Sequence, residues 1–365
     1  MAAPEPMPGY EELGRRCYRS LAGALRGCTD CGWELSRRTW AENARLAWSE
    51  PLLCLVCAVG WTVVRRAASR RLFRRFAEAY KEQLDEKGLC RASLDEAGST
   101  ATSAGSGKAG YVTAVGEVTT VFAAAADLTL LCCSPFRPDW RKGAEVPTDI
   151  AVAYLIQCSF YCHSIYASLY MDAWRKDSVV MLIHHVVTFV LIALSYVFRY
   201  HSVGILVLFL HDISDIQLEF TKLNVYFKYR RGVYHPLNDF ISNVGCISFS
   251  ISWFWFRLYW FPLKVLYATC HSSLLSVPNI PFYFFFNALL FLLTLMNLYW
   301  FTYIVFFVAK VLMGQVREVN DVREYDIDAE KKAAALEKND GKLHNSSPCK
   351  ERKHLMNGIV KDKRL

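Results

Sequence analysis

The sequence predicts an all-α fold, a polytopic transmembrane helix bundle that ends in a disordered C-terminal tail. Hydrophobic residues make up 53% of the 365 residues, which is more than an ordinary soluble protein of this size carries. They gather in runs of about 18 to 25 residues, the length that crosses a hydrocarbon core about 30 Å thick. Residues 314–365, in contrast, are polar, charged and poor in aromatic side chains.

Six hydrophobic runs are predicted to span the membrane. They lie at about 47–64, 149–171, 178–198, 203–221, 240–261 and 282–310. A seventh run, at about 111–133, is weaker because Glu117 and Asp127 interrupt it. Each carboxylate there would cost about 2.5–3.5 kcal/mol near the centre of a spanning helix.

The predicted organisation follows from these runs. Residues 1–46 form an N-terminal segment, and residues 47–64 form the first helix. A basic segment with the atypical run 111–133 covers residues 65–145. The main membrane domain covers residues 146–313, and the tail covers residues 314–365. No removable signal peptide is expected, because the start lacks a compact basic-then-apolar pattern.

Orientation is predicted from the basic residues beside the spans, since cytoplasmic flanks hold the excess. The arginines that follow the first span place the N-terminus in the lumen and, if the spans alternate, the C-terminus in the cytoplasm. This orientation is consistent along the whole chain only if the chain crosses the membrane once more between Arg75 and Asp149. Lys361 and Lys363 near the carboxyl end look like a dilysine retrieval signal, which predicts the endoplasmic reticulum membrane.

The thirteen cysteines are scattered, and most are expected to be inert small hydrophobes within apolar runs. Two CxxC pairs occur, Cys28 with Cys31 and Cys54 with Cys57. The second pair lies inside a predicted span, and no histidine or cysteine pair at zinc-finger spacing accompanies the first. The sequence therefore predicts no metal site.

Ionisable side chains inside spanning segments are expensive, so each needs a partner or a function. In the 178–198 run, His184, Thr188 and Ser195 fall on one helical face through steps of four and seven. His185 points elsewhere and is expected beside His184 or in support of it. His163, in the preceding span, is a further candidate.

The 203–221 run carries a charged stripe. Steps of four, four and three put His211, Asp215, Glu219 and Lys222 on one face, with Asp212 near Asp215 on the next turn. Such a stripe in lipid must face a bundle interior or a hydrated cavity. Buried polar contacts between helices are the alternative. Three histidines and two aspartates in two consecutive spans favour chemistry.

The candidate site is defined by these two runs. Its predicted catalytic residues are His184, His185, His211, Asp212 and Asp215, and its predicted supporting residues are His163, Thr188, Ser195 and Glu219.

These motifs resemble those of a known family. His184-His185-x-x-Thr188, Ser195-Tyr196, Gly204 and His211-Asp212-x-x-Asp215, with Leu218, Glu219 and Lys222, look like the Lag motif of the ceramide synthases within the TLC membrane domain. The resemblance continues through Tyr161–Tyr166, Met171–Asp177 and Trp253–Arg257 and covers about 146–325. A homeobox-like segment found in many family members has no counterpart here.

The resemblance implies N-acylation of sphinganine or sphingosine by a long-chain acyl-CoA, and it is strongest to the member associated with stearoyl-CoA. It implies that acyl-CoA is a co-substrate, that no cofactor is bound and that membrane lipid is a partner. A homo- or heterodimer is also compatible with the resemblance. An anionic CoA would meet a basic rim of Arg175, Lys176, Lys222 and Lys228, with Arg230 and Arg231. No nucleic acid is expected, because the arginines of 65–75 are typical of a topology signal.

Histidine can serve such a reaction in two ways. His184 can act as a general base near neutrality, or it can attack the thioester and form an acyl-imidazole that the amine resolves. The shared face of His184, Thr188 and Ser195 slightly favours the covalent route.

Two other classes of protein remain open at this stage. A di-iron hydroxylase needs repeated HxxxH and HxxHH boxes, which the nine histidines here do not form. A non-catalytic TLC protein in lipid sensing or protein export would share the helices and lack the site.

Overall fold

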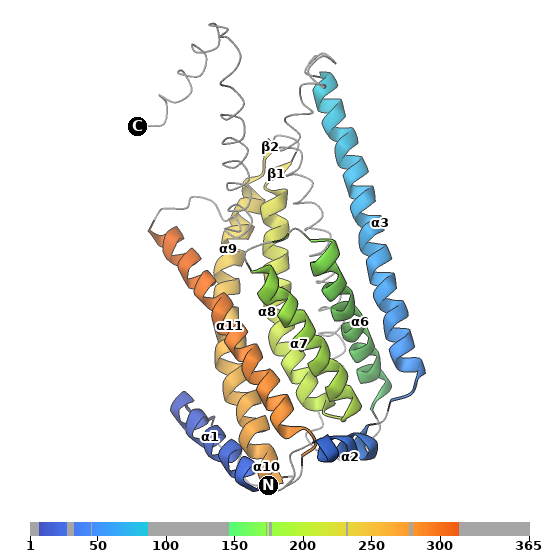
Figure 1. The fold of residues 1–365 in the computed structure, drawn as a ribbon. Coiled ribbons are helices and arrows are strands. Elements are labelled where there is room, and N and C mark those ends of the chain that lie inside the picture. Colours follow the sequence, from blue (N-terminus) through green and yellow to red (C-terminus); the bar gives the residue numbers. More distant parts are fainter. Residues whose placement is uncertain are drawn as a thin grey trace, which may run out of the picture. The chain divides into compact units, whose positions relative to one another are not determined.

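The computed structural model describes residues 7–27, 33–44, 46–86, 146–172, 174, 177–230, 233–276 and 280–313. Apart from one pair of two-residue strands, the described elements are helices (Figure 1). The predicted all-α class is therefore confirmed. The weak run 111–133 and the tail 314–365 lie outside the described residues.

The long helices are α1 (Tyr10–Gly27), α2 (Trp33–Asn43), α3 (Ser49–Glu86), α6 (Thr148–Tyr170), α7 (Ser178–Val197), α8 (His201–Phe227), α9 (Pro236–Trp253) and α11 (Tyr283–Leu312). Beyond Trp253, the rod that α9 begins continues as the π-helical segments η1 (Phe254–Leu266) and η2 (Ala268–Ser272) and as the short α10 (Ser273–Ser276). Strands β1 (Tyr229–Arg230) and β2 (Val233–Tyr234) pair antiparallel between α8 and α9.

Four helices of the described chain are long and apolar enough to cross a membrane. These segments are Ser49–Arg71, Thr148–Tyr170, Ser178–Val197 and Tyr283–Lys310. The last three match predicted spans closely, whereas the first begins near the start of the predicted span 47–64 and runs past its end. The predicted spans 203–221 and 240–261 do form helices, α8 and α9 with η1, but neither is among these four. In α8, the histidine and the acidic side chains of the charged stripe lower the mean hydropathy.

Two features of the N-terminal part were not predicted. Helix α3 continues to Glu86, well past the predicted end of the first span at residue 64. Arginine, alanine, leucine, glutamate and lysine dominate the added turns, and all are strong helix formers. Helices α1 and α2 occupy the predicted N-terminal segment, and α1 has the acidic first turn and basic last turn that suit a helix dipole.

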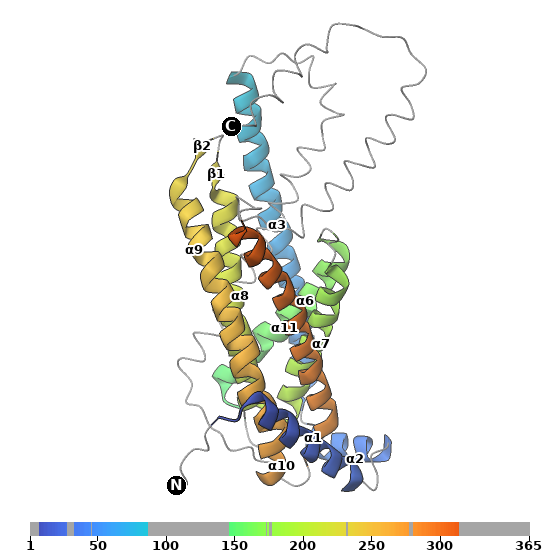
Figure 2. The ribbon, with the colours of Figure 1, turned by 90° about the vertical axis from the view of Figure 1, so that its left-hand side faces the viewer.

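Helices α3 and α6 run parallel, whereas the later neighbours alternate in direction (Figures 1 and 2). Trp61 and Thr62 of α3 bond to Ser159 and His163 of α6, so the contacts advance together along both helices. Between α6 and α7 the order reverses, because Ser168 meets His185 while Tyr154 meets Ser195. Helices α9 and α11 follow the same alternation.

Two glycines allow close approaches between helices. A Cβ added at Gly204 of α8 would lie 2.0 Å from the Tyr154 hydroxyl and 2.9 Å from Ser195 Oγ. A Cβ at Gly245 of α9 would lie 2.4 Å from Thr221 Oγ1. These positions let α6, α7, α8 and α9 enclose a buried interior.

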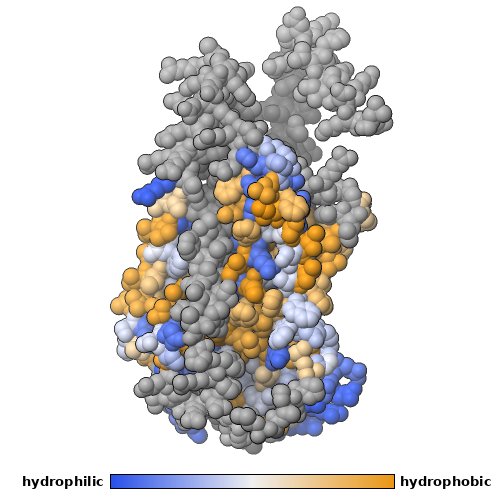
Figure 3. Space-filling view, turned by 180° about the vertical axis from the view of Figure 1, so that it is seen from behind, coloured by the Kyte–Doolittle hydropathy of each residue, from blue (hydrophilic) through white to orange (hydrophobic). Residues whose placement is uncertain are grey.

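The buried side chains form two hydrophobic clusters. The larger joins α7, α8, the α9–η1 rod and α11 with residues of α1, and the smaller joins α6, α7 and α8. On the outside, exposed apolar side chains cover much of the face seen in Figure 3. An apolar exterior around a core that also holds polar groups is the arrangement a lipid environment selects.

Candidate active site

His184 is a buried imidazole without a hydrogen bond in the described part of the chain. Its Nδ1 is fully buried and unpartnered, and the Oγ1 of Thr188, one turn later, is also buried and unpartnered. The ring meets Trp300 of α11 edge-on, with ring centroids 5.3 Å apart, and Tyr161 of α6 at 6.4 Å. Buried polar atoms nearly always have partners, so this pair of atoms is suited to receive a substrate.

His211 of α8, in contrast, has both ring nitrogens in contact with polar groups. Nδ1 lies 2.8 Å from the carbonyl oxygen of Val207, which can only accept, so Nδ1 carries the proton. Nε2 lies 3.0 Å from the amide nitrogen of Asn297 on α11, which donates to it. These two contacts define a neutral imidazole with a fixed tautomer.

Arg257 of η1 organises the surroundings of His211. Its guanidinium donates to Ser214 Oγ at 2.7 Å and to the His211 carbonyl at 2.8 Å, and it pairs with Asp215 at 2.5 Å. A longer contact, 3.4 Å, reaches Asn297 Oδ1 and turns the amide nitrogen of Asn297 toward His211. Arg257 is only 2% exposed, and this fork satisfies most of its donors.

Aromatic side chains connect His184 with the Arg257 network. The guanidinium lies over the Trp253 ring at 4.0 Å, Trp253 meets Trp300 at 6.4 Å, and Trp300 meets His184. Trp300 Nε1 also donates to Asp177, the residue before α7, at 3.4 Å. His184 lies within electrostatic reach of both His211 and Arg257. The structure therefore brings the two predicted histidines into one polar region.

The two predicted aspartates separate toward different helices. Asp212 faces α6, where Gln157 Nε2 donates to it at 3.1 Å, while Asp215 faces η1 and pairs with Arg257. Asp212 is buried, and the side chain of Asp215 is 27% exposed. Each carboxylate is thus in contact with a positioning side chain of a neighbouring helix.

His163 and His185 belong to a second polar cluster, between α3, α6 and α7. Thr62 lies 2.9 Å from His163 Nδ1, and Ser168 lies 3.0 Å from His185 Nδ1. The same cluster contains an ion pair of 2.5 Å between Arg65 and Asp172. The His185 ring remains 5.9 Å from that of His184, so it borders the first region.

The other predicted supporting residues lie further along their helices. Ser195 is buried but bonds to Tyr154 at 3.2 Å and to the Ile192 carbonyl, beside Gly204. Glu219 is buried and pairs with Lys222 at 3.4 Å. Ser195 therefore serves the packing of α6, α7 and α8, and the Glu219 pair extends the charged stripe toward the α8 carboxyl end.

The predicted basic rim is only partly within the described residues. Lys228 is buried and pairs with Asp239 at 2.7 Å, and its ammonium lies 5.9 Å from the Tyr234 ring. Hydrogen bonds from Lys228 and Tyr234 lower the pKa of the Asp239 carboxyl below its usual value. Arg175, Lys176, Arg231 and the Arg230 side chain lie outside the described residues.

Sequence reasoning missed several side chains of this region. Arg257 and Asn297 lie inside apolar runs, and the rule that ionisable or polar groups in spans need a reason would have found them. Arg257 and Asp177 ended two stretches that carry the family resemblance, Trp253–Arg257 and Met171–Asp177, but neither was predicted as a site residue. Gln157 and Trp300 carried no distinct signal, because their roles arise only from packing between helices.

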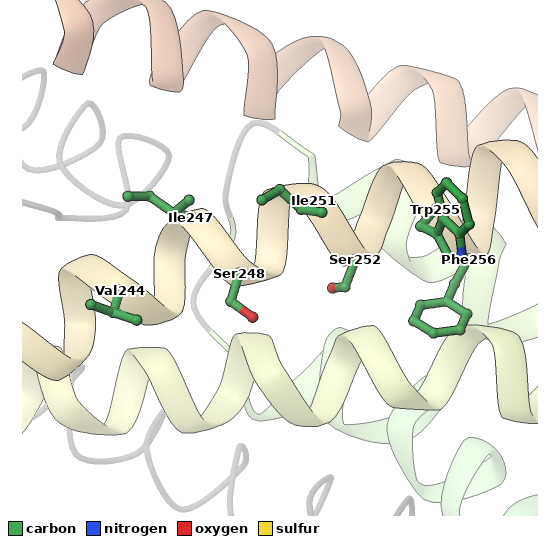
Figure 4. Close-up of a pocket in the computed structure, with 7 residues that line it drawn as sticks. All are labelled: Val244, Ile247, Ser248, Ile251, Ser252, Trp255 and Phe256. Atoms are coloured by element: carbon green, nitrogen blue, oxygen red, sulfur yellow. The ribbon is translucent and has the colours of Figure 1, made fainter.

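The described residues also contain an apolar groove, which lies apart from these polar groups. It has a volume of about 480 Å³ and follows one face of α9 and the start of η1, between Val244 and Phe256 (Figure 4). No charged side chain lines it, and its two serines are the polar contribution. Among the described residues, no group of three histidine, cysteine or acidic side chains could hold a metal ion.

A buried polar region within apolar helices defines a multi-pass membrane protein with an internal site. The family model of the TLC domain, TRAM_LAG1_CLN8, matches residues 114–305, so the match begins before the predicted domain boundary at 146. Ceramide synthase 1 of Homo sapiens is 55% identical over 363 residues, covering 99% of this chain and 97% of the relative. Ceramide synthase 1 of Mus musculus is 54% identical, covering 100% and 97%.

A plant relative is similar over a shorter part. Ceramide synthase LOH2 of Arabidopsis thaliana is 30% identical over 184 residues, or 49% of this chain and 59% of the relative. The chain belongs to the ceramide synthase family of TLC-domain membrane proteins. The resemblance stated from the motifs is confirmed.

Proposed function

We propose that this protein transfers a stearoyl group from stearoyl-CoA to the primary amine of sphinganine or sphingosine, with His184 as the reacting imidazole. The general activity follows from membership of the ceramide synthases, which are acyl-CoA-dependent sphingoid base N-acyltransferases of the EC 2.3.1 class. The stearoyl preference rests on the similarity to ceramide synthase 1. Acyl-CoA is a co-substrate, and no bound cofactor is part of the proposal.

The observation that carries the role of His184 is its lack of a hydrogen bond among the described residues. The three other histidines of the region contact Thr62, Ser168 or Asn297 through a ring nitrogen. A nucleophile or base needs a free lone pair. His163 also has a buried Nε2 without a partner, but its Nδ1 is held by Thr62, whereas neither ring nitrogen of His184 is hydrogen-bonded among the described residues.

The proposed reaction has two steps. First, the neutral His184 imidazole attacks the thioester carbonyl, the carbon–sulfur bond breaks, and CoA leaves as a thiolate that takes up the N–H proton of the acylated imidazole. The unprotonated sphingoid amine then attacks the acyl-imidazole. The amide bond forms, the bond between the acyl carbon and the imidazole nitrogen breaks, and the proton lost by the amine restores the neutral imidazole. Thr188 Oγ1 lies one turn from His184 and is also buried without a partner, which supports a proposed contact with the acyl oxygen.

His211, Asp212 and Asp215 act as positioning residues in this proposal. The fixed tautomer of His211 presents a neutral ring beside the region, and Arg257 and Asn297 hold that ring in place. Asp215 neutralises Arg257, and Asp212 is held by Gln157 on the α6 side. His185 and His163 support the opposite wall through α3 and α6.

The experiment uses microsomes that contain the full chain, sphinganine and a panel of acyl-CoAs. Stearoyl-CoA should give the highest rate, His184→Ala should abolish ceramide formation, and the control His235→Ala should retain it. Incubation with acyl-CoA alone should add one acyl mass to the tryptic peptide from Asp177 to Arg199, which contains His184.

An active His184→Ala enzyme contradicts the assignment of His184. An acyl group on cysteine, or none, contradicts the covalent route and leaves general-base catalysis by His184. Ceramide from none of the acyl-CoAs would favour a non-catalytic TLC protein.

The proposed setting is the endoplasmic reticulum membrane, with the N-terminus in the lumen and the C-terminus in the cytoplasm. Because α3 and α6 run parallel, the chain must return across the membrane between them. The run 111–133 is the proposed segment, and the TLC match from residue 114 supports it. Glycosylation of a sequon inserted before Tyr10 tests the orientation. Replacement of Lys361 and Lys363 tests whether they form a retrieval signal for the endoplasmic reticulum. Unchanged localisation of the variant would mean that the membrane domain carries the localisation signal instead.

A further inference from the structure

Helix α1 is held against the η1–η2 end of the rod by one of its faces. The Tyr10 hydroxyl donates to the Leu258 carbonyl at 2.9 Å, and Ser20 Oγ lies 3.0 Å from His271 Nδ1. Between these contacts, Arg16 donates to the Tyr267 hydroxyl at 2.5 Å. Tyr10, Cys17 and Ser20 are spaced by seven and three residues, so they share a face. Contacts on either side of Cys17 along the helix therefore fix where it is placed.

Cys17 faces a second cysteine across this interface. Cys17 and Cys270 of η2 are 3% and 0% exposed, belong to one hydrophobic cluster, and are close enough for their thiols to interact. Cys17 Sγ also lies 3.8 Å from the Leu266 carbonyl, and Cys270 Sγ lies 2.9 Å from Asn287 Oδ1. Leu266 precedes Cys270 by four residues, so the contact with its carbonyl places Cys17 beside Cys270 in a closed interface.

Whether two neighbouring thiols stay reduced or form a disulfide depends on the side of the membrane that they face. The α1 and η2 contacts lie at the end of the bundle opposite the β1–β2 hairpin (Figure 2). In the proposed orientation the hairpin end is cytoplasmic, so this end faces the lumen. Cytosolic thiols stay reduced, whereas the lumen of the endoplasmic reticulum supports disulfides.

We propose that Cys17 and Cys270 form a disulfide that links α1 to the η1–η2 end of the rod. The two thiols lose two protons and two electrons to an oxidising protein disulfide by thiol–disulfide exchange, and that disulfide becomes a dithiol. The exchange takes place while α1 docks, because the closed interface then excludes other thiols. No sequence pattern pairs these two cysteines, which are far apart in the chain. This proposal rests on the proposed orientation and not on acyl transfer.

The test examines the full-length wild-type chain, so it does not depend on a variant that folds. Cells are quenched with acid to stop thiol exchange and dissolved in denaturant with N-ethylmaleimide. Trypsin releases Cys17 in the tripeptide Cys17–Arg19, and chymotrypsin shortens the Cys270 peptide. Mass spectrometry without reductant should find these two peptides linked, and reduction should separate them.

Variants give a second readout. After blocking, reduction should expose two thiols to a mass-tagging maleimide in the wild type, and these two should disappear in Cys17→Ser and in Cys270→Ser. The control Cys246→Ser should keep them. Recovery of Cys17 and Cys270 with a maleimide on each, or a link from Cys17 to another cysteine, overturns the proposal. Ceramide formation by the same microsomes is measured separately, so a missing link and a missing activity are distinguished.

Discussion

Asn297 of α11 holds its amide nitrogen 3.0 Å from Nε2 of His211 on α8, and Arg257 fixes the direction of that amide. A polar side chain in a strongly apolar helix thereby sets the protonation state of an imidazole on another helix.

Asn297→Asp should lower kcat by about 10- to 100-fold, the size of effect found when the orienting partner of an imidazole is removed. The carboxylate cannot donate to Nε2 and favours a protonated ring. The acid limb of the pH–rate profile should therefore move to higher pH, which a purely structural role would not cause. Asn287→Asp, the same change on the same helix, is the control. An unchanged profile would exclude the positioning role.

Asp215→Asn should destabilise the protein by about 3–5 kcal/mol, because it leaves the Arg257 charge buried without its partner. Adding Arg257→Met removes that charge, so the double variant should be less destabilised than the sum of the single changes. Thermal unfolding of purified protein measures these effects. Glu11→Gln, which breaks the exposed pair of Glu11 with Arg15, should change little. Strict additivity would contradict the coupling.

Gly204→Ala should sharply reduce folded protein, because the new methyl group would lie 2.0 Å from the Tyr154 hydroxyl. Overpacking of this kind typically costs about 1–3 kcal/mol. Adding Tyr154→Phe removes the clashing oxygen and should restore part of the yield. Gly60→Ala is a matched control, since nothing lies within 4 Å of its Cβ position. Equal yields for Gly60→Ala and Gly204→Ala, measured by size-exclusion chromatography, would show that the close approach is unimportant.

Lys228 offers a choice between a structural ion pair and a CoA contact. Because Lys228 pairs with Asp239, Lys228→Met and Asp239→Asn should destabilise the protein by similar amounts, and the double variant should be destabilised by less than the sum of the two. The lowered pKa of Asp239 means that this contribution is present at neutral pH and is lost as pH falls through that lowered value. A selective rise in KM for acyl-CoA in Lys228→Met, absent in Asp239→Asn, would instead place Lys228 on the CoA rim.

The sequence predicted the helices well where hydrophobic length alone determines them. The runs 149–171, 178–198 and 282–310 differ from the observed helices by only one or two residues at most ends, since a hydrocarbon core sets the minimum length of a span. Helix α3 ended much later than predicted, because beyond the membrane helix propensity, rather than hydrophobicity, decides where a helix stops.

The candidate site was predicted less completely. Helical spacing placed His184 and Thr188 on one face correctly, and both are buried without partners. Spacing within α8 could not show that Asp212 and Asp215 turn to different neighbours, since that depends on which helices pack on each side. Asn297 was not predicted for the same reason, because its role depends on a contact with His211, which is 86 residues away in the chain.

The continuity of α9 with the π-helical η1 has a consequence for how this rod can change. A π-helix closes its hydrogen bonds from i to i+5, so each turn holds more residues than an α-helical turn. The half of the rod at Phe261 is therefore rotated, relative to the half at Gly245, from where a continuous α-helix would place it. The half at Gly245 packs on α8, and the half at Phe261 packs on both α8 and α11. Insertion or deletion of one residue between Phe254 and Leu266 would rotate one half against the other, so length in this segment is constrained as tightly as residue identity.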